Sequence, residues 1–397
     1  MNELTIKTAI SDGIDRLSIL IVKEKKINNN EKLVEIRKEK KMLEESLKDK
    51  LKFDVIKYYY RLLCLINEKI WDLLDEAKYN SKTEKDELKN YREQEDYNER
   101  RFRVKKKIDD FTESNIKEQK GYKKNTAFVL MHLGLGDHGY MIGMVRYLST
   151  KYDSVIVVCY NKNKKNMELF FKDDRTIELM GVESNEDISP NRGFSMEKFL
   201  EITKGMDLYL SGCHSLTKPY KIYDYPFCFY DDVGIEHSVF WDYGYIPKSD
   251  NALQVYYSIP IEYRDNYVFV HNSASTGIVY TLEDMEEKLN IKREEMLFIN
   301  PCYNVYKEGD KFYEIAETFL GHRLPEYIFT IENAKYVSLS DSSFLGMAWN
   351  LNIKTDNCYY LGRDLNYDHL YNEKYKPRKE LNKMKFKNLG IKSLFKN

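Results

Sequence analysis

The sequence predicts a mixed α/β protein, in which an all-helical segment precedes two Rossmann-like domains that face each other across a cleft. Two observations support this expectation. Residues 1–120 contain none of the eight prolines and one of the 18 glycines, and their 29 Lys/Arg and 26 Asp/Glu nearly balance. A charged segment almost free of glycine and proline favours helix over strands and turns. From Asn125 onward, short apolar runs alternate with helical patterns, which is typical of βαβ units.

Apolar residues in the first segment recur at the spacing of one helix face. The first such set comprises Ile10, Ile14, Leu17 and Ile21. A run of asparagines at 28–30 predicts a break, and the helical period then resumes over 33–47, 52–77 and about 84–107. Four helices with short polar breaks predict an antiparallel bundle or long hairpins. A continuous coiled coil is not expected, because no heptad is sustained.

The helical segment also contains the one strongly basic run of the chain. It comprises Arg100, Arg101, Arg103, Lys105, Lys106 and Lys107. Two interpretations are open: a solvated helix face, or a contact for a phosphate-bearing glycan, a lipid headgroup or a partner protein. We expect the segment to be an appended module for assembly or acceptor targeting, through which the chain could form a homo-oligomer or bind a partner.

Composition argues against several classes of function. A formal net charge of −1 gives no electrostatic footprint for nucleic acid. No run of about 18 apolar residues occurs, so no transmembrane segment is expected, and the first residues lack the basic and apolar regions of a secretory signal. The six cysteines include no CxxC pair, which predicts reduced thiols without a disulfide or zinc framework. We therefore expect a cytoplasmic protein.

The first α/β half begins with an apolar run at 127–131, as in a buried strand. A loop with Gly134, Gly136, Asp137 and His138 follows, and then a helical pattern and a second strand at 154–159. Doubly wound sheets bind ligands in such a loop, at the carboxyl end of the first strand. The glycines match G-x-G-x-x-G, but no acidic residue ends the second strand to hold an adenosine ribose, which argues against dinucleotide binding. Asp137 could equally be a plain helix N-cap.

The second half repeats the alternation. Strands are predicted at 266–270, 296–300 and 336–339, and helices at 282–289, 312–320 and 344–351. A loop of small residues, 271–277, follows the first of these strands, and Asp341, Ser342 and Ser343 open the last helix. Plain helix capping is the alternative role for Asp341 and Ser342.

Asp231 and Asp232 follow an apolar run, 227–230, that we interpret as a strand. Adjacent residues on a strand point to opposite faces, so at most one of these carboxylates could line the acceptor side of a site. A simple turn is the alternative for this pair.

Three stretches of the body resemble GT-B glycosyltransferases, closest to the ADP-heptose lipopolysaccharide heptosyltransferase superfamily of bacteria and large DNA viruses. They are Gly134–Asp137, His271–Ser275 and Ser340–Ala348, and the resemblance covers about 125–375. The stretch PFCFYDDVGIEHSVFWDYGYIP is typical of the viral and bacterial relatives, which would place the protein in the host cytoplasm if it is viral. The first segment resembles an uncharacterised family of bacterial helical proteins.

The resemblance implies four regions. They are a helical domain at 1–120, an acceptor domain at 121–250, a nucleotide-sugar domain at 251–375 and a basic tail at 376–397. In the acceptor domain it makes Asp137 the base that deprotonates the acceptor hydroxyl, and His138 is the alternative because its pKa also suits proton transfer.

In the nucleotide-sugar domain the resemblance assigns donor binding to polar side chains that follow the strands. They are His271, Ser273, Ser275, Thr276, Asp341, Ser342 and Ser343. A carboxylate beside a diphosphate would be repelled, so Asp341 is expected to cap the helix or to contact a sugar hydroxyl. The family places a Lys or Arg shortly after the serine loop, but 272–287 contains none, and Lys335 or Arg363 would have to replace it.

These features predict a glycosyltransferase that moves a sugar from a nucleotide-sugar to a hydroxyl of a glycan, with inversion. No D-x-D triplet occurs, which argues for a metal-independent reaction, and no cofactor is expected besides the nucleotide-sugar substrate. A sugar-nucleotide epimerase or hydrolase of the same fold is one alternative. A non-catalytic glycan-binding or assembly protein is the other.

Overall fold

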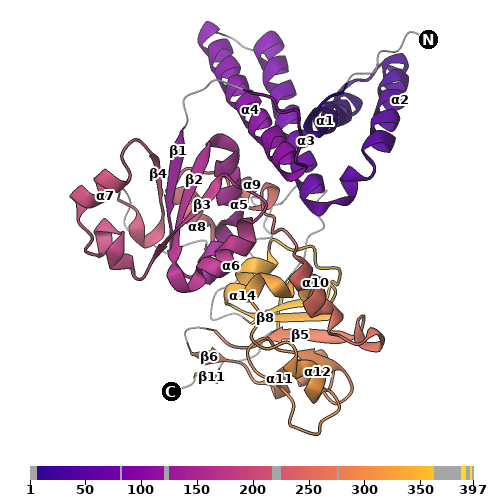
Figure 1. The fold of residues 1–397 in the computed structure, drawn as a ribbon, viewed down its shortest axis with the longest axis vertical. Helices are drawn as coiled ribbons and strands as arrows, with labels where there is room; N and C mark the ends of the chain where they lie inside the picture. Colours follow the sequence, from indigo (N-terminus) through magenta and orange to yellow (C-terminus); the bar gives the residue numbers. More distant parts are fainter. Residues whose placement is uncertain are drawn as a thin grey trace. The chain divides into compact units, whose positions relative to one another are not determined.

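The computed structural model describes residues 7–80, 83–119, 125–216, 225–274, 277–361, 386–389 and 394–395. Its chain forms two compact units (Figure 1). The first comprises Met1–Ala127, Arg146–Val155 and Lys172–Glu178, and the second comprises Phe128–Val145, Ile156–Phe171 and Leu179–Asn397. The predicted domain ranges 121–250 and 251–375 both fall largely in the second unit and stay predictions.

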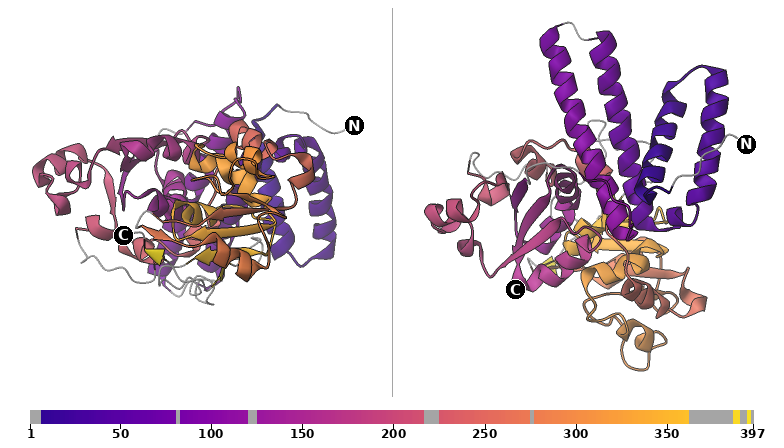
Figure 2. Two further views of the ribbon diagram at one scale, coloured as in Figure 1. Left: turned by 90° about the horizontal axis from the view of Figure 1, so that it is seen from below. Right: turned by 45° about the horizontal axis from the view of Figure 1, so that its top comes forward.

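The first unit contains the four predicted helices. They are α1 (Ile10–Lys26), α2 (Asn30–Leu47), α3 (Asp54–Asp75) and α4 (Glu84–Phe111). The helices α2 and α4 begin at side-chain caps, because Asn29 accepts a hydrogen bond from the Lys32 amide and Thr83 accepts one from the Asp86 amide. The right-hand view of Figure 2 shows two helical hairpins, and α1 packs against α2, α3 and α4. The structure therefore has the predicted hairpins.

The bundle buries its predicted apolar face together with a polar cluster. Ile14, Leu63 and Ile66 are fully buried. Beside them, the Asn67 amide donates to Asp15 Oδ1 at 3.0 Å and to Ser18 Oγ. Asn67 thus satisfies Asp15 and Ser18 inside the bundle, which favours this one register of the helices.

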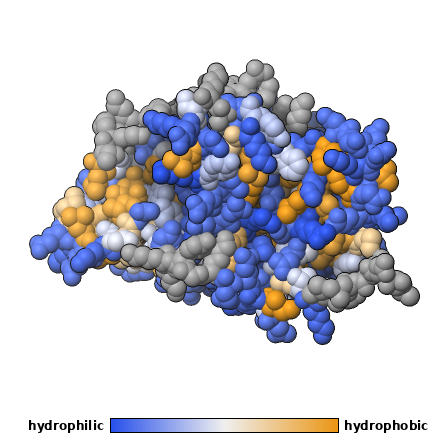
Figure 3. Space-filling view, turned by 90° about the horizontal axis from the view of Figure 1, so that it is seen from above, coloured by the Kyte–Doolittle hydropathy of each residue, from blue (hydrophilic) through white to orange (hydrophobic). Residues whose placement is uncertain are grey.

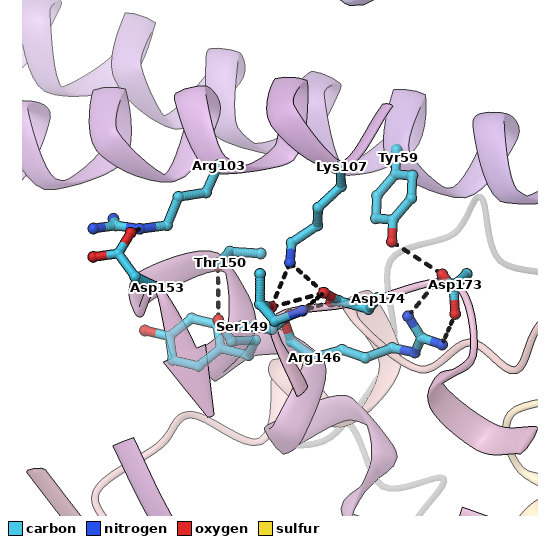
Figure 4. A network of polar contacts seen from close by, with 11 residues as sticks. Tyr59, Arg103, Lys107, Arg146, Ser149, Thr150, Asp153, Asp173 and Asp174 are labelled. Atoms are coloured by element: carbon cyan, nitrogen blue, oxygen red, sulfur yellow. Dashed lines mark hydrogen bonds and ion pairs between the residues drawn. The ribbon is translucent and has the colours of Figure 1, made fainter. Parts of the chain in front are cut away.

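A buried network of charges lies on one side of α4 (Figure 4). The Lys107 ammonium contacts Asp174 Oδ1 and donates to Thr176 Oγ1 at 2.8 Å, and Ser149 donates to Asp174 Oδ2 at 2.8 Å. Burial would raise the pKa of Asp174, but the charges of Lys107 and Arg146 and hydrogen bonds from Lys107 and Thr176 hold it below its ordinary value. Asp174 is therefore an ionised carboxylate in the interior.

A second buried ion pair continues this network. Arg146 lies 2.7 Å from Asp173 Oδ1, and the Tyr59 hydroxyl of α3 donates to Asp173 Oδ2 at 3.0 Å. The guanidinium of Arg146 also lies over the ring of Tyr58, 5.3 Å from its centroid. Helices α3 and α4 and the segments Arg146–Val155 and Lys172–Glu178 of the same unit are thus joined by desolvated charges.

The structure contradicts one interpretation of the basic run, a solvated helix face, while the other interpretation, a contact for a phosphate-bearing ligand or a partner, stays a prediction. Arg100, Arg103 and Lys107 are buried, and Lys107 is only 4% exposed. Arg101 pairs with Asp15, and Lys105 pairs with Asp12 and Glu118. The balanced charge of this segment reflects internal pairing, because each of these cations lies against a carboxylate of the same unit. Lys106 alone of the six is exposed.

The second unit begins with a sheet in the order β3-β2-β1-β4. Its strands are β1 (Thr126–Leu130), β2 (Ser154–Tyr160), β3 (Ile177–Val182) and β4 (Asp207–Leu210). The connecting helices are α5 (Leu135–Lys151), α6 (Asn161–Phe171) and α7 (Met196–Ile202). The core of this half packs Phe128, Leu130 and Val158 against Phe199 of α7.

Helix α7 is amphipathic. Phe199 is fully buried, while Met196 and Leu200 are exposed one turn apart. Apolar side chains gather at the left edge of Figure 3, on the side where α7 lies in Figure 1. The helix therefore covers the sheet with one face only.

The other sheet of this unit is parallel, in the order β10-β9-β8-β5-β7. Its strands are β5 (Tyr267–His271), β7 (Leu297–Ile299), β8 (Tyr336–Ser340), β9 (Cys358–Leu361) and β10 (Lys387–Asn388). Phe269 of β5 pairs with Ile299 on one side and with Val337 on the other. A short antiparallel pair joins β6 (Ile278–Val279) to β11 (Leu394–Phe395). These strands follow one another as in a doubly wound fold.

Short helices complete the second unit. They are α8 (Phe227–Asp232), α9 (Ser238–Asp242), α10 (Asp250–Tyr257), α11 (Leu282–Leu289), α12 (Tyr313–Glu317), α13 (Ile328–Glu332) and α14 (Ser343–Ala348). In the described part of the chain, no helix has the length and apolar character needed to cross a membrane. Of the predicted tail at 376–397, the structure describes 386–389 and 394–395.

The predicted strand at 227–230 is wrong, because these residues form the first part of α8. All four are buried. A segment that is apolar on every side has the same sequence pattern in a strand and in a helix, so periodicity could not distinguish them. The helices predicted at 312–320 and 344–351 are present but shorter, as α12 and α14.

Glycines bring the two halves of the second unit into backbone contact. A Cβ on Gly139 of α5 would lie 2.6 Å from the Gly346 carbonyl carbon of α14 and 2.8 Å from the Met347 nitrogen. The Asn350 amide donates to the Gly139 carbonyl oxygen at 2.9 Å, closing the contact. A side chain on either glycine would push α5 and α14 apart.

We expect Gly139→Ala to destabilise the protein by about 1–3 kcal/mol, because the new methyl group meets backbone that has little freedom to move. Gly13→Ala is the matched control: Gly13 is also helical, and its nearest neighbour is the flexible Leu47 side chain at 3.4 Å. Helix propensity should make that variant about 0.5–1 kcal/mol more stable. Urea unfolding measures both, and equal effects would contradict the contact.

We expect Lys107→Met to lower the free energy of unfolding by about 3–5 kcal/mol, because it leaves the Asp174 carboxylate buried without its cation. The exposed Lys106→Met should change it by less than about 0.5 kcal/mol. Since the pKa of Asp174 is lowered, its stabilisation is present above the ordinary carboxyl pKa and is lost as the pH falls. The deficit of Lys107→Met should therefore shrink in acid, and a pH-independent deficit would contradict an ionic role.

Candidate functional site

Each sheet of the second unit has one point at which its strand order reverses. In the first sheet this switch point lies between β1 and β4, and in the second it lies between β5 and β8. Open α/β sheets bind ligands outside the carboxyl ends of the strands at such points. The polar residues that follow these four strands are therefore the candidate site.

At the first switch point, the loops after β1 and β4 are joined by hydrogen bonds. The Cys213 amide donates to Nε2 of His132 at 3.1 Å, so the proton of this neutral imidazole is on Nδ1. The Gly212 amide donates to Oδ2 of Asp232 at 2.7 Å. Gly212 has a φ of +62°, and a Cβ there would collide with the His132 ring. Because Gly212 has no side chain, the His132 ring can extend from the end of β1 to the loop after β4.

Asp137 lies in the first turn of α5, beside the same strand end. Its Oδ1 accepts a hydrogen bond of 2.9 Å from the Tyr225 hydroxyl. The Tyr225 ring packs edge-on against Tyr140, with centroids 5.0 Å apart, and against Phe229 at 5.5 Å. A Cβ on Gly134 would lie 2.6 Å from Asp137 Oδ2, so the glycine makes room for the carboxylate. The base that the resemblance implies is therefore held by an aromatic residue from a distant part of the chain.

His138 has a different environment. It is 1% exposed, and neither ring nitrogen has a hydrogen-bond partner among the described residues. Burial lowers the pKa of His138 to about 4, so the ring is neutral at pH 7. A ring without contact to solvent or to a polar group is poorly placed to take a proton from a substrate, which favours Asp137 of the two predicted bases.

The two predicted acceptor-side carboxylates diverge. Asp232 binds the Gly212 amide at the switch point, whereas Asp231 lies 2.7 Å from Nε2 of His237. The His237 ring in turn stacks on Phe227, with centroids 4.6 Å apart. The expectation that at most one aspartate faces the site does not depend on a strand, because successive residues of a helix also point in different directions.

Charges from this cluster act on His132. Burial lowers the pKa of His132, the charge of Asp137 raises it, Arg192 lowers it and Asp232 raises it, and the net shift is downward. The sequence analysis missed His132 and Tyr225 as site residues. His132 had a weak signal, because it stands directly after the first strand, but Tyr225 had none, because its role depends on a contact 88 residues away.

At the second switch point, His271 joins the loops after β5 and β8. Its Nδ1 lies 3.0 Å from Ser340 Oγ and 3.0 Å from Ser342 Oγ, and its ring packs against Phe344. The Ser340 hydroxyl donates to the Ser273 carbonyl, so it accepts from Nδ1–H of His271. Ser342 Oγ then accepts from the same N–H, and its own hydroxyl hydrogen has no acceptor among the residues that the structure describes. Burial lowers the pKa of His271 to about 4, so the ring is uncharged.

Of the remaining predicted donor residues, the structure describes Asp341 and Ser343 but not Ser275 and Thr276. Asp341 is buried, and the Ser343 backbone nitrogen lies 3.4 Å from the position of a Cβ on Gly136. Gly136 therefore packs against the second half, which is a structural role for one of the two predicted loop glycines. Ser275 and Thr276 lie outside the described residues.

Lys335 lies at the amino end of β8, so it is not placed to replace the Lys or Arg that the resemblance leads one to expect after the serine loop. It precedes β8, and its ammonium donates to Asn266 at 2.8 Å, just before β5. The five residues of β8 separate this edge from the carboxyl edge by about 16 Å. Arg363, the other candidate, lies outside the described residues.

Comparisons with known proteins gave one structural similarity. No family model and no curated protein matches this chain. Among solved structures, the chain is similar to a glycosyl transferase family 9 protein from Veillonella parvula DSM 2008, at 13% identity and a TM-score of 0.38. The similarity covers 63% of this chain and 84% of that protein.

We expect Gly212→Ala to cost more stability than Gly234→Ala. Both glycines have positive φ, +62° and +68°, so both variants carry backbone strain of about 1–2 kcal/mol. Only at Gly212 does the new methyl group also meet His132, because nothing lies within 4 Å of a Cβ on Gly234. Urea unfolding measures the difference, and equal losses would mean that His132 does not pack against this loop.

Proposed function

We propose that the second unit transfers a sugar from a nucleotide-sugar donor to a hydroxyl of a glycan acceptor, with inversion and without a metal ion. The observation that supports this most is the chemistry of the two switch points. One carries a carboxylate oriented by a tyrosine, and the other carries a neutral histidine–serine cluster. The contact between Gly139 and Gly346 joins the helices that follow β1 and β8. The motif resemblance of 125–375 agrees with these roles.

In the proposed reaction, Asp137 accepts the proton of the acceptor hydroxyl. The acceptor oxygen attacks the anomeric carbon, and the bond from that carbon to the diphosphate oxygen breaks, so the nucleoside diphosphate leaves with the electron pair. The Tyr225 hydroxyl donates to Oδ1 of Asp137 and so fixes the orientation of the carboxylate. Tyr225 is therefore a positioning residue for the base.

On the donor side, we assign the leaving diphosphate to the carboxyl edge of β5 and β8. The free hydroxyl hydrogen of Ser342 suits a phosphate oxygen, and the neutral His271 fixes the orientation of Ser342. The acceptor would lie on the side of His132, Asp137 and Asp232, where carboxylates can accept hydrogen bonds from sugar hydroxyls.

One observation favours a second candidate, a non-catalytic glycan-binding protein. Lys335 lies at the edge of the sheet opposite to the proposed diphosphate, so it does not supply the cation that the resemblance leads one to expect. Transfer and binding differ in turnover, so an assay of product formation separates them.

We expect the wild-type protein to convert a nucleotide-sugar from a donor panel only when a glycan acceptor is present. Asp137→Asn should lower turnover by about 10²–10⁴-fold without changing donor binding, because the amide does not accept the proton. The control Asp250→Asn changes an exposed carboxylate of α10 and should retain the wild-type rate. Products identified by mass spectrometry decide the outcome: sugar release or epimerisation without acceptor indicates the other enzyme class, and wild-type turnover by Asp137→Asn excludes this base.

Tyr225→Phe separates positioning from packing, since the ring remains and only the hydroxyl is lost. We expect a smaller loss of turnover than with Asp137→Asn and a shift of the acid limb of the pH–rate profile to higher pH. A hydrogen bond to the charged carboxylate favours that form, and removing it makes protonation easier. An unchanged pH profile would mean that Tyr225 only fills space.

A further inference from the structure

We propose that Tyr303 is the platform on which the base of a nucleoside diphosphate stacks, beside the His271–Ser342 cluster. The inference rests on the proposed function and names the part of the donor that this edge of the sheet reads. It comes from a set of polar residues after β5 and β7 that the sequence analysis did not single out.

The hydroxyl of Tyr303 is fixed by the buried Asn272, which is held in turn by the buried Asn300. Asn272 directly follows β5 and Asn300 directly follows β7, and each is 2% exposed. Asn272 Nδ2 lies 2.9 Å from the Tyr303 hydroxyl oxygen, and that hydroxyl lies 3.1 Å from Asn272 Oδ1. The Asn300 amide donates to the same Oδ1 at 3.0 Å. Residues at the carboxyl ends of two neighbouring strands thus hold the Tyr303 hydroxyl in place, Asn272 directly and Asn300 through Asn272.

The ring of Tyr303 is exposed although its hydroxyl is fixed. Tyr303 is 40% exposed, whereas Tyr306 in the same loop is 7% exposed. The Tyr306 hydroxyl accepts from the Phe298 amide at 2.7 Å, inside the fold. Tyr306 therefore packs inside the loop. Tyr303 presents an aromatic surface that the folded protein already holds in place, so a ligand that binds there loses little side-chain conformational entropy.

The position along the sheet suits a nucleotide. His271 and Asn272 are consecutive residues, so the cluster with Ser342 and the anchor of Tyr303 adjoin each other at the end of β5. Strands β8, β5 and β7 are neighbours in the sheet. Adjacent strands are about 5 Å apart, so β8 and β7 lie about 10 Å apart across the sheet, and β8 ends three residues beyond β7 in the register. The anchor of Tyr303 is nearer than the end of β7, because Asn272 directly follows His271, whose Nδ1 lies 3.0 Å from Ser342 Oγ. A ribose can therefore connect a diphosphate at Ser342 to a base at Tyr303.

The electrostatics near Tyr303 also suit a base. Arg293 is a cation whose charge acts on Tyr303. Its guanidinium pairs with Glu283 and lies 3.4 Å from Glu286, so its charge is balanced. A neutral environment suits an uncharged base better than a phosphate, and stacking on an aromatic face does not require charge.

The anchor also predicts how the base is read. The Asn272 amide donates to the Tyr280 carbonyl at 2.7 Å, and its other polar positions are occupied by Tyr303 and Asn300. Asn272 therefore has no hydrogen bond to offer to the edge of a base. We infer that this platform reads the face of the base and distinguishes purines from pyrimidines weakly, because every base has a π-face.

Calorimetric titration of the full-length protein tests the proposal. The probes are adenosine diphosphate, uridine diphosphate and inorganic pyrophosphate. We expect Tyr303→Ala to weaken both nucleotides by about 5- to 100-fold and to leave pyrophosphate unchanged. Tyr303→Phe keeps the ring and should lose less than about 5-fold. The control Tyr257→Ala removes a tyrosine that is 54% exposed at the end of α10, and should bind like the wild type.

Each remaining outcome overturns the inference, and one of them also overturns the proposed function. If Tyr303→Ala binds the nucleotides as tightly as the wild type, the base lies elsewhere and the inference is wrong, while the proposed function stands. If Tyr303→Ala weakens pyrophosphate as much as the nucleotides, Tyr303 only supports the edge of the sheet, and the inference is again wrong. If the wild type binds neither nucleotide, the proposed function fails and the inference fails with it. Thermal unfolding of each variant verifies that it is folded.

Discussion

The architecture of the second unit depends on one close approach, between Gly139 of α5 and Gly346 of α14. Helix α5 follows β1 and helix α14 follows β8, so contact between these helices brings the switch points of two sheets into one region. Gly136 and Asn350 complete the contact from either side. The glycines of the first loop therefore serve packing between the halves at least as much as they serve a ligand, and this explains why a literal G-x-G-x-x-G spacing occurs without the acidic partner of a dinucleotide site.

A second constraint operates in the first unit, where charge is buried. Lys107, Arg146, Asp173 and Asp174 form pairs that solvent hardly reaches, and hydroxyl groups satisfy the remaining polar atoms. Desolvating such groups is costly, so the pairs persist only because both partners are present. Most of the basic run of the helical segment is therefore part of the interior of the unit.

The candidate site combines neutral and charged groups in different places. His271 is buried and uncharged, which suits a residue that orients serine hydroxyls. The pKa of His132 is also lowered, although Asp137 and Asp232 act in the opposite direction. Asp137 and Asp232 belong to the first switch point, whereas hydroxyl and amide groups surround His271 at the second, with the buried Asp341 beside them. This division supports separate tasks, proton transfer at one and donor binding at the other.

Much of the fold could be predicted from sequence, because its signals are local. The scarcity of glycine and the absence of proline before residue 120 predicted the helical segment. The alternating apolar runs predicted β1, β2, β5, β7 and β8, but β3, β4, β9 and β10 were not predicted. The run at 227–230 gave the wrong element, since a fully apolar segment has no period. Only the tertiary structure decided which charges are buried, that Tyr225 holds Asp137, that His138 lies without a polar partner among the described residues, and that Lys335 lies at the far edge. Burial and pairing depend on residues that are distant in the chain, and no local pattern encodes them.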